Sequence, residues 1–425
     1  MQAQSTEQLL AGWQIGRLQP MPERIPESWE LVRLTDVAIL ESGHTPSRRF
    51  PEYWKGNIPW ISLHDTNGLD VAEIFTTAQT IGELGLANSS ARLLPRGTVV
   101  FSRTATVGKC TVMGRSMATS QDFANYVCGP RIHNFYLAHL FRFLAPEWKR
   151  LRAGSTLNTI YMPVFRDLQV LLPPIEEQKK ISGALNDVDA MLSALDRLIA
   201  KKRDLKQATM QRLLTGRTRL PGFSSSWEAI YVGDLFSFKN GLNKAKEFFG
   251  IGTPIVNYMD VYGSPGLYAS GLQGRVLVTS NERKAFSVQK GDVFFTRTSE
   301  TVDEIGLAAV MLDNCKDTVF SGFLLRGRPK NNRLCDNFKK YCFQSRSVRA
   351  QITARASYTT RALTNGRLLS AVLLELPTVE EQEAIATVLS DMDAELTALE
   401  QRREKTRLLK QGMMQELLTG RTRLI

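Results

Sequence analysis

The chain has 425 residues, of which 43% are hydrophobic and 23% are charged, and its formal net charge is +12. This composition is typical of a soluble globular protein, and the chain length suggests two or three domains. No apolar run reaches the roughly 18 residues of a membrane span. The N-terminal residues do not resemble a signal peptide, and the five scattered cysteines form no CxxC pair, so we expect a cytoplasmic protein without disulfides or a zinc site.

The first variable part, residues 29–171, combines short β-rich runs bounded by glycine and proline with helical stretches such as 134–153. A long loop over 42–60 is rich in glycine, proline, aromatic and basic residues. Long loops on a rigid scaffold are common binding surfaces. We therefore expect a mixed α and β domain that carries a binding loop.

Residues 172–220 are expected to form a long amphipathic helix. Their apolar residues recur at alternating spacings of four and three, which predicts a heptad seam. Within this segment Pro173 and Pro174 precede the helix, Glu176 and Glu177 occupy its first turn, and Gly216 follows its last turn, as suits the start and the end of a helix. A helix from about Pro174 to Thr215 would be roughly 60 Å long at about 1.5 Å per residue.

A second variable part follows at 221–375, and residues 376–425 then repeat the helical segment. The two helical segments align without a gap, more than half of the aligned positions are identical, and each segment contains LLTGRTRL. The variable parts are related more faintly, for example in LPRGTVVFSRT and VQKGDVFFTRT. Residues 1–28 contain EQLLAG, which aligns with QRLLTG near the end of the first helical segment. The chain is therefore a duplicated module in cyclic order.

Two nearly identical amphipathic helices in one chain favour pairing with each other over separate docking of each helix. An antiparallel coiled coil would separate the two variable domains. We expect its seam to contain these residues: Ile181, Leu185, Val188, Leu192 and Leu195 in the first helix, and Ile385, Leu389, Met392, Leu396 and Leu399 in the second.

The charge of the second variable part points to a polyanionic ligand. Between Leu325 and Arg367 there are eleven basic residues and one acidic residue, with four aromatic residues among them. Such a run is either a solvated basic face or a surface that binds nucleic acid, since Lys and Arg supply most non-specific affinity for phosphates.

The sequence lacks the motifs of common catalytic and cofactor sites. VGKC at 107–110 ends like a phosphate-binding loop, but Arg103 replaces the required glycine and Cys110 the required serine or threonine. The four histidines show no metal-ligand spacing, and no GxSxG elbow or methyl-transfer motif is present. We therefore expect a chain that is not an enzyme and that recognises a ligand for other subunits.

These features together resemble the specificity subunit of type I restriction-modification enzymes. The resemblance rests on the duplicated order of a variable part opening WExxxLxD, the start LPxxEEQ and a long helix, and on GTVVFSRTATVGK; it extends from Trp29 to Arg423. It implies an α+β protein with two target recognition domains, two conserved spacer helices and an internal two-fold repeat. The implied function is non-catalytic recognition of a bipartite site in double-stranded DNA.

The resemblance also implies partner subunits. Two methyltransferase subunits would dock on the spacer helices, and restriction and translocase subunits would join the complex. S-adenosylmethionine, ATP and Mg²⁺ would then bind to those partners, with no cofactor in this chain. Two alternatives stay open: the recognition subunit of a related combined restriction and methylation system, and a coiled-coil scaffold that does not bind DNA.

Most of the candidate DNA-binding residues lie in matching places of the two variable parts, whereas Tyr358 and Arg361 lie just before the second long helix. Arg103 and Arg297 each follow a β-rich run, where an arginine could contact guanine or phosphate or form an internal salt bridge. Trp29 and Trp227, which open the two parts, are expected in the core. The candidates are His44, Arg48, Arg49, Lys55, Arg103 and Lys109 in the first part, and Lys239, Lys244, Lys246, Arg297, Tyr358 and Arg361 in the second.

Overall fold

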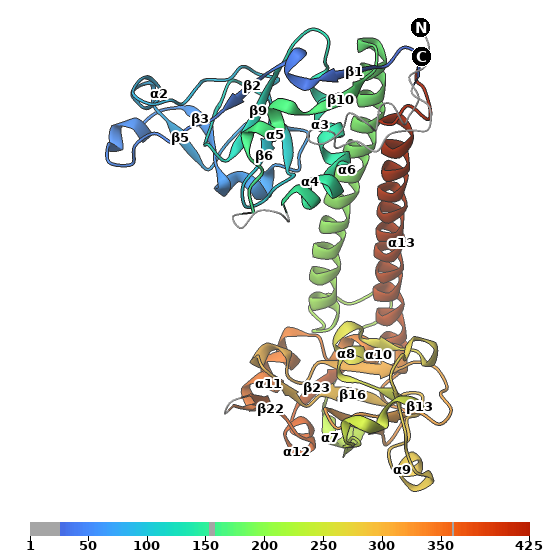
Figure 1. Cartoon of the computed structure of the whole chain (residues 1–425). Helices are drawn as coiled ribbons and strands as arrows, with labels where there is room; N and C mark the ends of the chain where they lie inside the picture. The colour runs from blue at the N-terminus through green and yellow to red at the C-terminus, as the bar shows by residue number, and fades with distance from the viewer. Residues whose placement is uncertain (1–25, 153–157, 359–360) are drawn as a thin grey trace. The chain divides into compact units, whose positions relative to one another are not determined.

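The computed structural model describes residues 26–152, 158–358 and 361–425, so the repeat fragment EQLLAG lies outside the described residues. The chain divides into two compact units, Met1–Arg197 with Gln401–Ile425, and Leu198–Glu400. Each unit contains one variable domain together with part of each long helix (Figure 1).

The variable domain of the first unit is a mixed α and β fold, as expected. Its main sheet has the strand order β2-β9-β6-β7-β4, and β5-β3-β8 and β1-β10 form smaller sheets. The elements are β1 (Glu30–Arg33), β2 (Ala38–Ser42), β3 (Ile58–Ile61), β4 (Glu73–Ile74), β5 (Gln79–Ile81), α2 (Glu83–Ala87), β6 (Val99–Ser102), β7 (Cys110–Met113), β8 (Ala118–Thr119), β9 (Phe123–Cys128), α3 (Asn134–Phe143), α4 (Ala145–Arg152), α5 (Met162–Asp167) and β10 (Gln169–Leu172).

The variable domain of the second unit repeats this topology. Its main sheet has the order β12-β20-β16-β18-β14, and β15-β13-β19 and β11-β23 form smaller sheets. The elements are β11 (Glu228–Tyr231), α7 (Val232–Leu235), β12 (Phe236–Asn240), β13 (Phe249–Val256), α8 (Tyr258–Gly263), β14 (Gly266–Leu267), β15 (Arg275–Val276), α9 (Ser280–Ala285), β16 (Val293–Thr296), β17 (Thr298–Ser299), β18 (Ala308–Met311), β19 (Val319–Phe320), β20 (Leu324–Pro329), α10 (Asp336–Cys342), α11 (Arg346–Arg355), β21 (Ser357–Tyr358), β22 (Ala362–Leu363), α12 (Gly366–Ser370) and β23 (Leu373–Leu376).

The matching strand orders confirm that the variable parts are duplicates. The central strand of each main sheet comes from one of the aligned β-rich runs: β6 in the first domain and β16 in the second. Both strands are fully buried, so apolar residues occupy both faces of each strand. The same strand pair is parallel in both domains, β4 with β7 and β14 with β18. The second domain also has a small sheet, β17-β22-β21.

The two long helices form as the heptad pattern predicts. They are α6 (Ile175–Leu213) and α13 (Val379–Leu417), each of 39 residues and without a break after the EEQ turn. Gly216 and Gly420 follow them with φ of +64° and +75°, the left-handed conformation expected at these positions. The helices are packed antiparallel, which confirms the predicted fold class (Figure 1).

Ion pairs between α6 and α13 show that the two helices run antiparallel inside each unit. In the first unit Asp189 of α6 contacts Lys410 of α13 at 2.5 Å, and Asp196 contacts Arg403 at 3.1 Å, so residue numbers rise along one helix as they fall along the other. In the second unit the pairs are Lys202–Glu395, Arg203–Glu400 and Lys206–Asp393.

The ends of the helices belong to the cores of the variable domains. In the first unit Ile181 and Leu185 are fully buried in one cluster with Met414, Leu417 and Leu418. In the second unit Ile385 and Leu389 are buried with Met210, Leu213 and Leu214. Of the other predicted seam residues, Leu195 is buried, and Val188, Leu192, Met392, Leu396 and Leu399 are partly buried.

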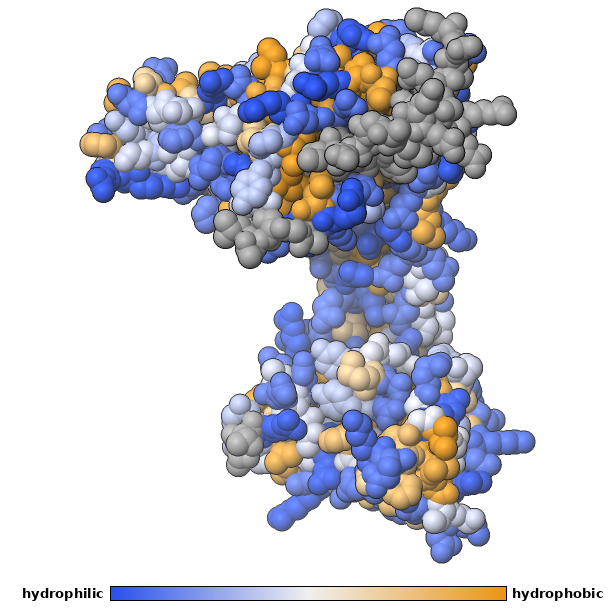
Figure 2. Space-filling model, viewed as in Figure 1, coloured by the Kyte–Doolittle hydropathy of each residue, from blue (hydrophilic) through white to orange (hydrophobic). Residues whose placement is uncertain are grey.

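The face of the molecule drawn in Figure 2 is largely polar. On the face drawn in Figure 2 hydrophilic residues predominate, and hydrophobic residues gather in small groups. No helix among the described residues has both the length and the apolar character required to cross a membrane.

Candidate nucleic-acid interface

The glutamine of each EEQ motif anchors the start of a long helix to its variable domain. Gln178 Oε1 accepts a hydrogen bond from the His133 amide at 2.8 Å, and its Nε2 donates to the carbonyls of Arg131 and Pro173. Gln382 makes the equivalent bonds with the Cys335 amide and with two backbone carbonyls. Each buried amide is thus satisfied by the loop that precedes α3 or α10 and by the carbonyl of the proline before the long helix.

The second glutamate of the first EEQ motif forms a buried clasp with a tryptophan and an arginine. Arg423 Nε and Nη2 donate to Glu177 Oε1 and Oε2 at 2.6 and 2.7 Å, and Trp29 Nε1 donates to Glu177 Oε2 at 3.1 Å. The Glu177 side chain is only 4% exposed. Burial alone would raise the pKa of this carboxyl, but the bonds from Arg423 and Trp29 outweigh it and lower that pKa.

The second unit repeats the clasp atom for atom. Arg219 Nε and Nη2 donate to the two oxygens of Glu381, both at 2.6 Å, and Trp227 Nε1 donates to Glu381 Oε2 at 3.2 Å. The Glu381 side chain is 1% exposed. Because Arg423 comes from the second LLTGRTRL and Arg219 from the first, each copy of this sequence binds the glutamate of the other copy.

The close approach at the clasp requires a glycine after α13. Gly420 has a positive φ, and a Cβ at this position would lie 2.8 Å from Pro26 Cγ. An L-residue would be strained there, so the glycine allows the chain to turn toward Trp29.

A second repeated contact joins both helices to each domain. In the first unit Asp189 of α6 contacts Lys410 of α13 and also Arg142 of α3, at 3.6 Å. In the second unit Asp393 of α13 contacts Lys206 of α6 and accepts bonds from Lys340 and Tyr341 of α10 at 2.8 and 2.7 Å. Burial would raise the pKa of Asp393, but these donors outweigh it and lower that pKa.

The candidate residues of the first domain differ in how they are held. Arg103 donates to the carbonyls of Gln121 and Ile160, so its guanidinium joins backbone segments instead of pairing with a carboxylate. Lys109 pairs with Asp70 at 2.9 Å. His44, Arg49 and Lys55 are exposed.

Arg48 is exposed but held in a fixed position. Its guanidinium carbon lies 3.4 Å from the centroid of the Trp54 ring, and its Nη2 donates to Gln79 Oε1 at 2.8 Å. Trp54 packs edge-on against Trp60 with ring centroids 5.0 Å apart. An arginine held in this way keeps its remaining donors available to a ligand.

The candidate residues of the second domain also divide into held and exposed groups. Lys239 donates to the Ala285 carbonyl at 2.6 Å, and Lys244 pairs with Glu282 at 2.8 Å, which lowers the pKa of Glu282 to about 2. Arg297 lies near the Gly322 carbonyl, at 3.5 Å. Lys246, Tyr358 and Arg361 are exposed, and Arg361 lies 3.9 Å from Glu300.

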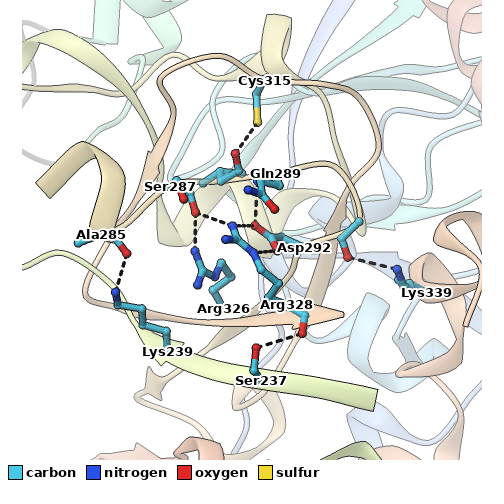
Figure 3. Close-up of polar contacts among 12 residues, drawn as sticks. Ser237, Lys239, Ala285, Ser287, Gln289, Asp292, Cys315, Arg326, Arg328 and Lys339 are labelled. Atoms are coloured by element: carbon cyan, nitrogen blue, oxygen red, sulfur yellow. Dashed lines mark hydrogen bonds and ion pairs between the residues drawn. The ribbon is translucent and has the colours of Figure 1, made fainter. Parts of the chain in front are cut away.

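The basic run between Leu325 and Arg367 is mostly engaged inside the second unit. Asp292 is fully buried and receives two bonds from Arg328, while Arg326 and Arg328 both donate to the Ser287 carbonyl (Figure 3). Other members of the run, Lys339, Lys340 and Arg349, have acidic or carbonyl partners, and the aromatic residues Phe338, Tyr341 and Phe343 are buried. The run is therefore neither a continuous solvated face nor a continuous phosphate-binding one.

Comparison with known proteins identifies the duplicated module. A family model described as "Type I restriction modification DNA specificity domain" matches residues 26–203 and 224–409. The chain belongs to this family. It is a non-catalytic DNA specificity subunit of a type I restriction-modification system.

Individual specificity subunits are similar along most of the chain. The "Type I restriction enzyme MjaVIII specificity subunit" of Methanocaldococcus jannaschii is 20% identical over 413 residues, 94% of either chain. The "Type I restriction enzyme MjaIX specificity subunit" of the same organism is 28% identical over 171 residues, 40% of either chain. A solved chain described under "complex assembly and conformational transition of the type I R-M system" shares the fold, with a TM-score of 0.61 at 17% identity over 94% of this chain and 100% of that one.

The sequence of this specificity subunit predicted core positions for Trp29 and Trp227, but it did not predict the pairing of Glu177 with Arg423. Glu177 and Arg423 are identical in both copies of the repeat, which was a visible signal. Identity alone does not show that a glutamate pairs with the arginine of the other copy, 246 residues away. Among the described residues of this specificity subunit, no group of three or more His, Cys, Asp and Glu side chains is placed to hold a metal ion.

Proposed function

We propose that each variable domain is a target recognition domain that reads one half of a bipartite site in double-stranded DNA. The observation that carries this proposal is the contrast between the junctions and the domain surfaces. The clasps, anchors and aspartate contacts are equivalent in both units, whereas the exposed loops carry different residues. Two domains that are attached to the helices in the same way but expose different residues are suited to recognising two different DNA sequences.

The exposed candidate residues are the proposed DNA contacts. Arg48 offers a planar, pre-positioned guanidinium that suits the O6 and N7 edge of guanine or a phosphate. Tyr358 is 60% exposed and offers an aromatic face close to Arg361 in sequence. His44, Arg49, Lys55 and Lys246 add donors or positive charge. Lys109, Lys239, Lys244 and the arginines Arg103 and Arg297 already have partners in this chain, so their proposed effect on DNA includes shaping the loops.

The spacer helices are the proposed docking sites for two methyltransferase subunits. Several positions are exposed and identical in both copies, among them Ala190 and Ala394, Lys201 and Lys405, and Leu205 and Leu409. Packing does not require identity at exposed positions, so contact with the same partner at each copy accounts for it. In this proposal restriction and translocase subunits complete a cytoplasmic complex, and S-adenosylmethionine, ATP and Mg²⁺ bind to the partners.

Sequencing of methylated sites tests the proposed function. We expect cells that express this chain with its methyltransferase to carry modification at one bipartite sequence with a fixed unread gap. Exchanging residues 221–375 for the matching part of a relative should change one half-site and leave the other half-site and the gap unchanged. A change in both half-sites would contradict the assignment of one reader to each domain.

Two simpler measurements separate the alternatives. A recognition complex should bind duplex DNA with an affinity that falls steeply as salt rises, because phosphate contacts release counterions. A coiled-coil scaffold would show no such binding. The subunits that copurify with the chain distinguish a type I complex from a combined system with fewer components.

A further inference from the structure

We propose that the two Trp–Glu–Arg clasps act as positioning residues that fix the register of each recognition domain on the helix pair, and so restrict the complex to one gap length. This inference rests on the proposed bipartite recognition. It assigns a role in specificity to Trp29, Glu177 and Arg423 in the first unit and to their counterparts in the second, none of which needs to touch DNA.

Each clasp joins three separate segments at one carboxylate. In the first unit these segments are the entry to the domain at Trp29, the start of α6 at Glu177, and the chain that follows α13 at Arg423. The Arg423 guanidinium also donates to Ser28 Oγ at 2.8 Å and lies 5.8 Å from the Trp29 ring centroid. Any sliding of the domain along the helices in this unit would break these bonds together.

The geometry of the arginine–carboxylate contact also favours a positioning role. A two-bond arginine–carboxylate contact requires coplanar groups and tolerates little displacement, unlike apolar packing, which adapts to small shifts. Buried ion pairs often contribute little net stability compared with apolar side chains of similar size, and their best-supported use is to select one register. The side chains of Glu177 and Glu381 are nearly fully buried. Their ion pairs are therefore better suited to positioning the domains than to stabilising the fold.

The clasp is also the same in both units although the two domains differ in sequence. Arg219, Glu381 and Trp227 form the same bonds to within about 0.1 Å of those in the first unit. A contact needed only to stabilise one domain would be free to differ between two domains of different sequence. Equal attachment of both domains is what a fixed gap between two readers requires.

The test is methylation-site sequencing in cells that express the full chain with its methyltransferase, because a genome contains the two half-sites at every gap length. The double variant Glu177→Gln with Arg423→Met keeps the acceptor for Trp29 and the volume of the arginine stem while removing both charges. We expect it to remain folded, and its methylation at gaps one base pair longer or shorter should rise about tenfold relative to the parental gap. The variant Glu381→Gln with Arg219→Met should give the same result.

Arg421→Met is the matched control. Arg421 lies two residues before Arg423 in the same GRTR sequence, but its side chain is 54% exposed and its acidic neighbour, Glu416, is 3.9 Å away. This variant should keep the single parental gap. If the double variant does not fold, Arg423→Lys decides the question, because lysine keeps the charge and loses the planar two-bond geometry; a relaxation of about threefold is then expected.

The outcomes separate the inference from the proposed function. If the parent methylates no bipartite sequence, the proposed function fails, and the positioning role fails with it. If the parent methylates one gap and a folded clasp variant keeps that gap with the parental selectivity, only the positioning role is overturned. Relaxed gap selection in both clasp variants, with an unchanged gap in Arg421→Met, supports it.

Discussion

Replacement of Leu195 by aspartate tests the packing of α6 in the helix pair. Leu195 is 6% exposed, so the substitution removes a buried apolar side chain and leaves a carboxyl in its place. Truncation of a buried leucine costs about 2–5 kcal/mol of unfolding free energy. A carboxyl shielded from water has a pKa raised by up to about 3 units, which adds up to about 4 kcal/mol near neutral pH. The loss is thus a large fraction of the stability of a typical domain.

Urea unfolding followed by far-ultraviolet circular dichroism measures this loss, since the two long helices dominate the signal. The variant should be destabilised by about 4 kcal/mol or more at about pH 7, and by less at about pH 4.5. The sign follows from the raised pKa: above it the buried carboxylate is charged and the full cost applies, and below it the folded protein binds the proton. Leu195→Asn should show no such pH dependence.

Leu205→Asp on the same helix is the control, because Leu205 is 49% exposed. Its unfolding free energy should stay within about 0.5 kcal/mol of the parent. If Leu195→Asp and Leu205→Asp had equal effects, or if the Leu195→Asp loss did not change with pH, the Leu195 side chain would not lie in a dry contact, and the reasoning would be refuted.

Three further predictions concern other contacts. Asp393→Ala should lower the unfolding free energy by about 1–3 kcal/mol because it leaves Lys340 partly buried without its partner, whereas Asp391→Ala at an exposed site should have little effect in the same urea experiment. Burial lowers the pKa of His139 to about 4, so between pH 6.5 and about 4 the unfolded chain binds a proton that the folded His139 does not. The unfolding free energy of the parent should therefore fall by up to about 3 kcal/mol over this range. In urea titrations the unfolding free energy of His139→Gln should fall by less. Arg48→Ala should weaken duplex binding by the complex roughly tenfold in a salt-controlled binding assay, as loss of one base or phosphate contact predicts, and an unchanged affinity would remove Arg48 from the interface.

The sequence predicted the elements whose signals are local or periodic. The heptad spacing, the glutamates in the first turn and the glycines after the helices located α6 and α13 to within about two residues, because these features report on backbone geometry near each residue. The central strands followed from runs such as GTVVFSRT for the same reason. The stretch 134–153, expected to be helical, contains two helices, α3 and α4.

The sequence did not reveal how its charges are used. From its composition, the basic run between Leu325 and Arg367 resembles a binding site for a polyanion. In the structure, however, Arg328 pairs with Asp292, 36 residues earlier, and Lys340 pairs with Asp393, 53 residues later. A carboxylate partner that comes from a distant segment leaves no local pattern. The alternatives for Arg103 omitted its backbone carbonyl partners for the same reason, because carbonyl positions depend on the complete fold.

The crossed pairing of the clasps gives a physical reason why the glutamate of one helical segment and the arginine of the other are retained together. Glu177 must fit Arg423 and Glu381 must fit Arg219, so a change in the arginine of one copy has to be matched by a change in the glutamate of the other. Among the described residues, the side-chain hydrogen bonds of the loop that carries Arg48 join it to its own domain, so this constraint does not apply to them. One domain can therefore change its exposed loops, and with them its target, while both clasps stay unchanged. Only the glutamate and the arginine of each clasp, which come from different copies of the repeat, have to match each other.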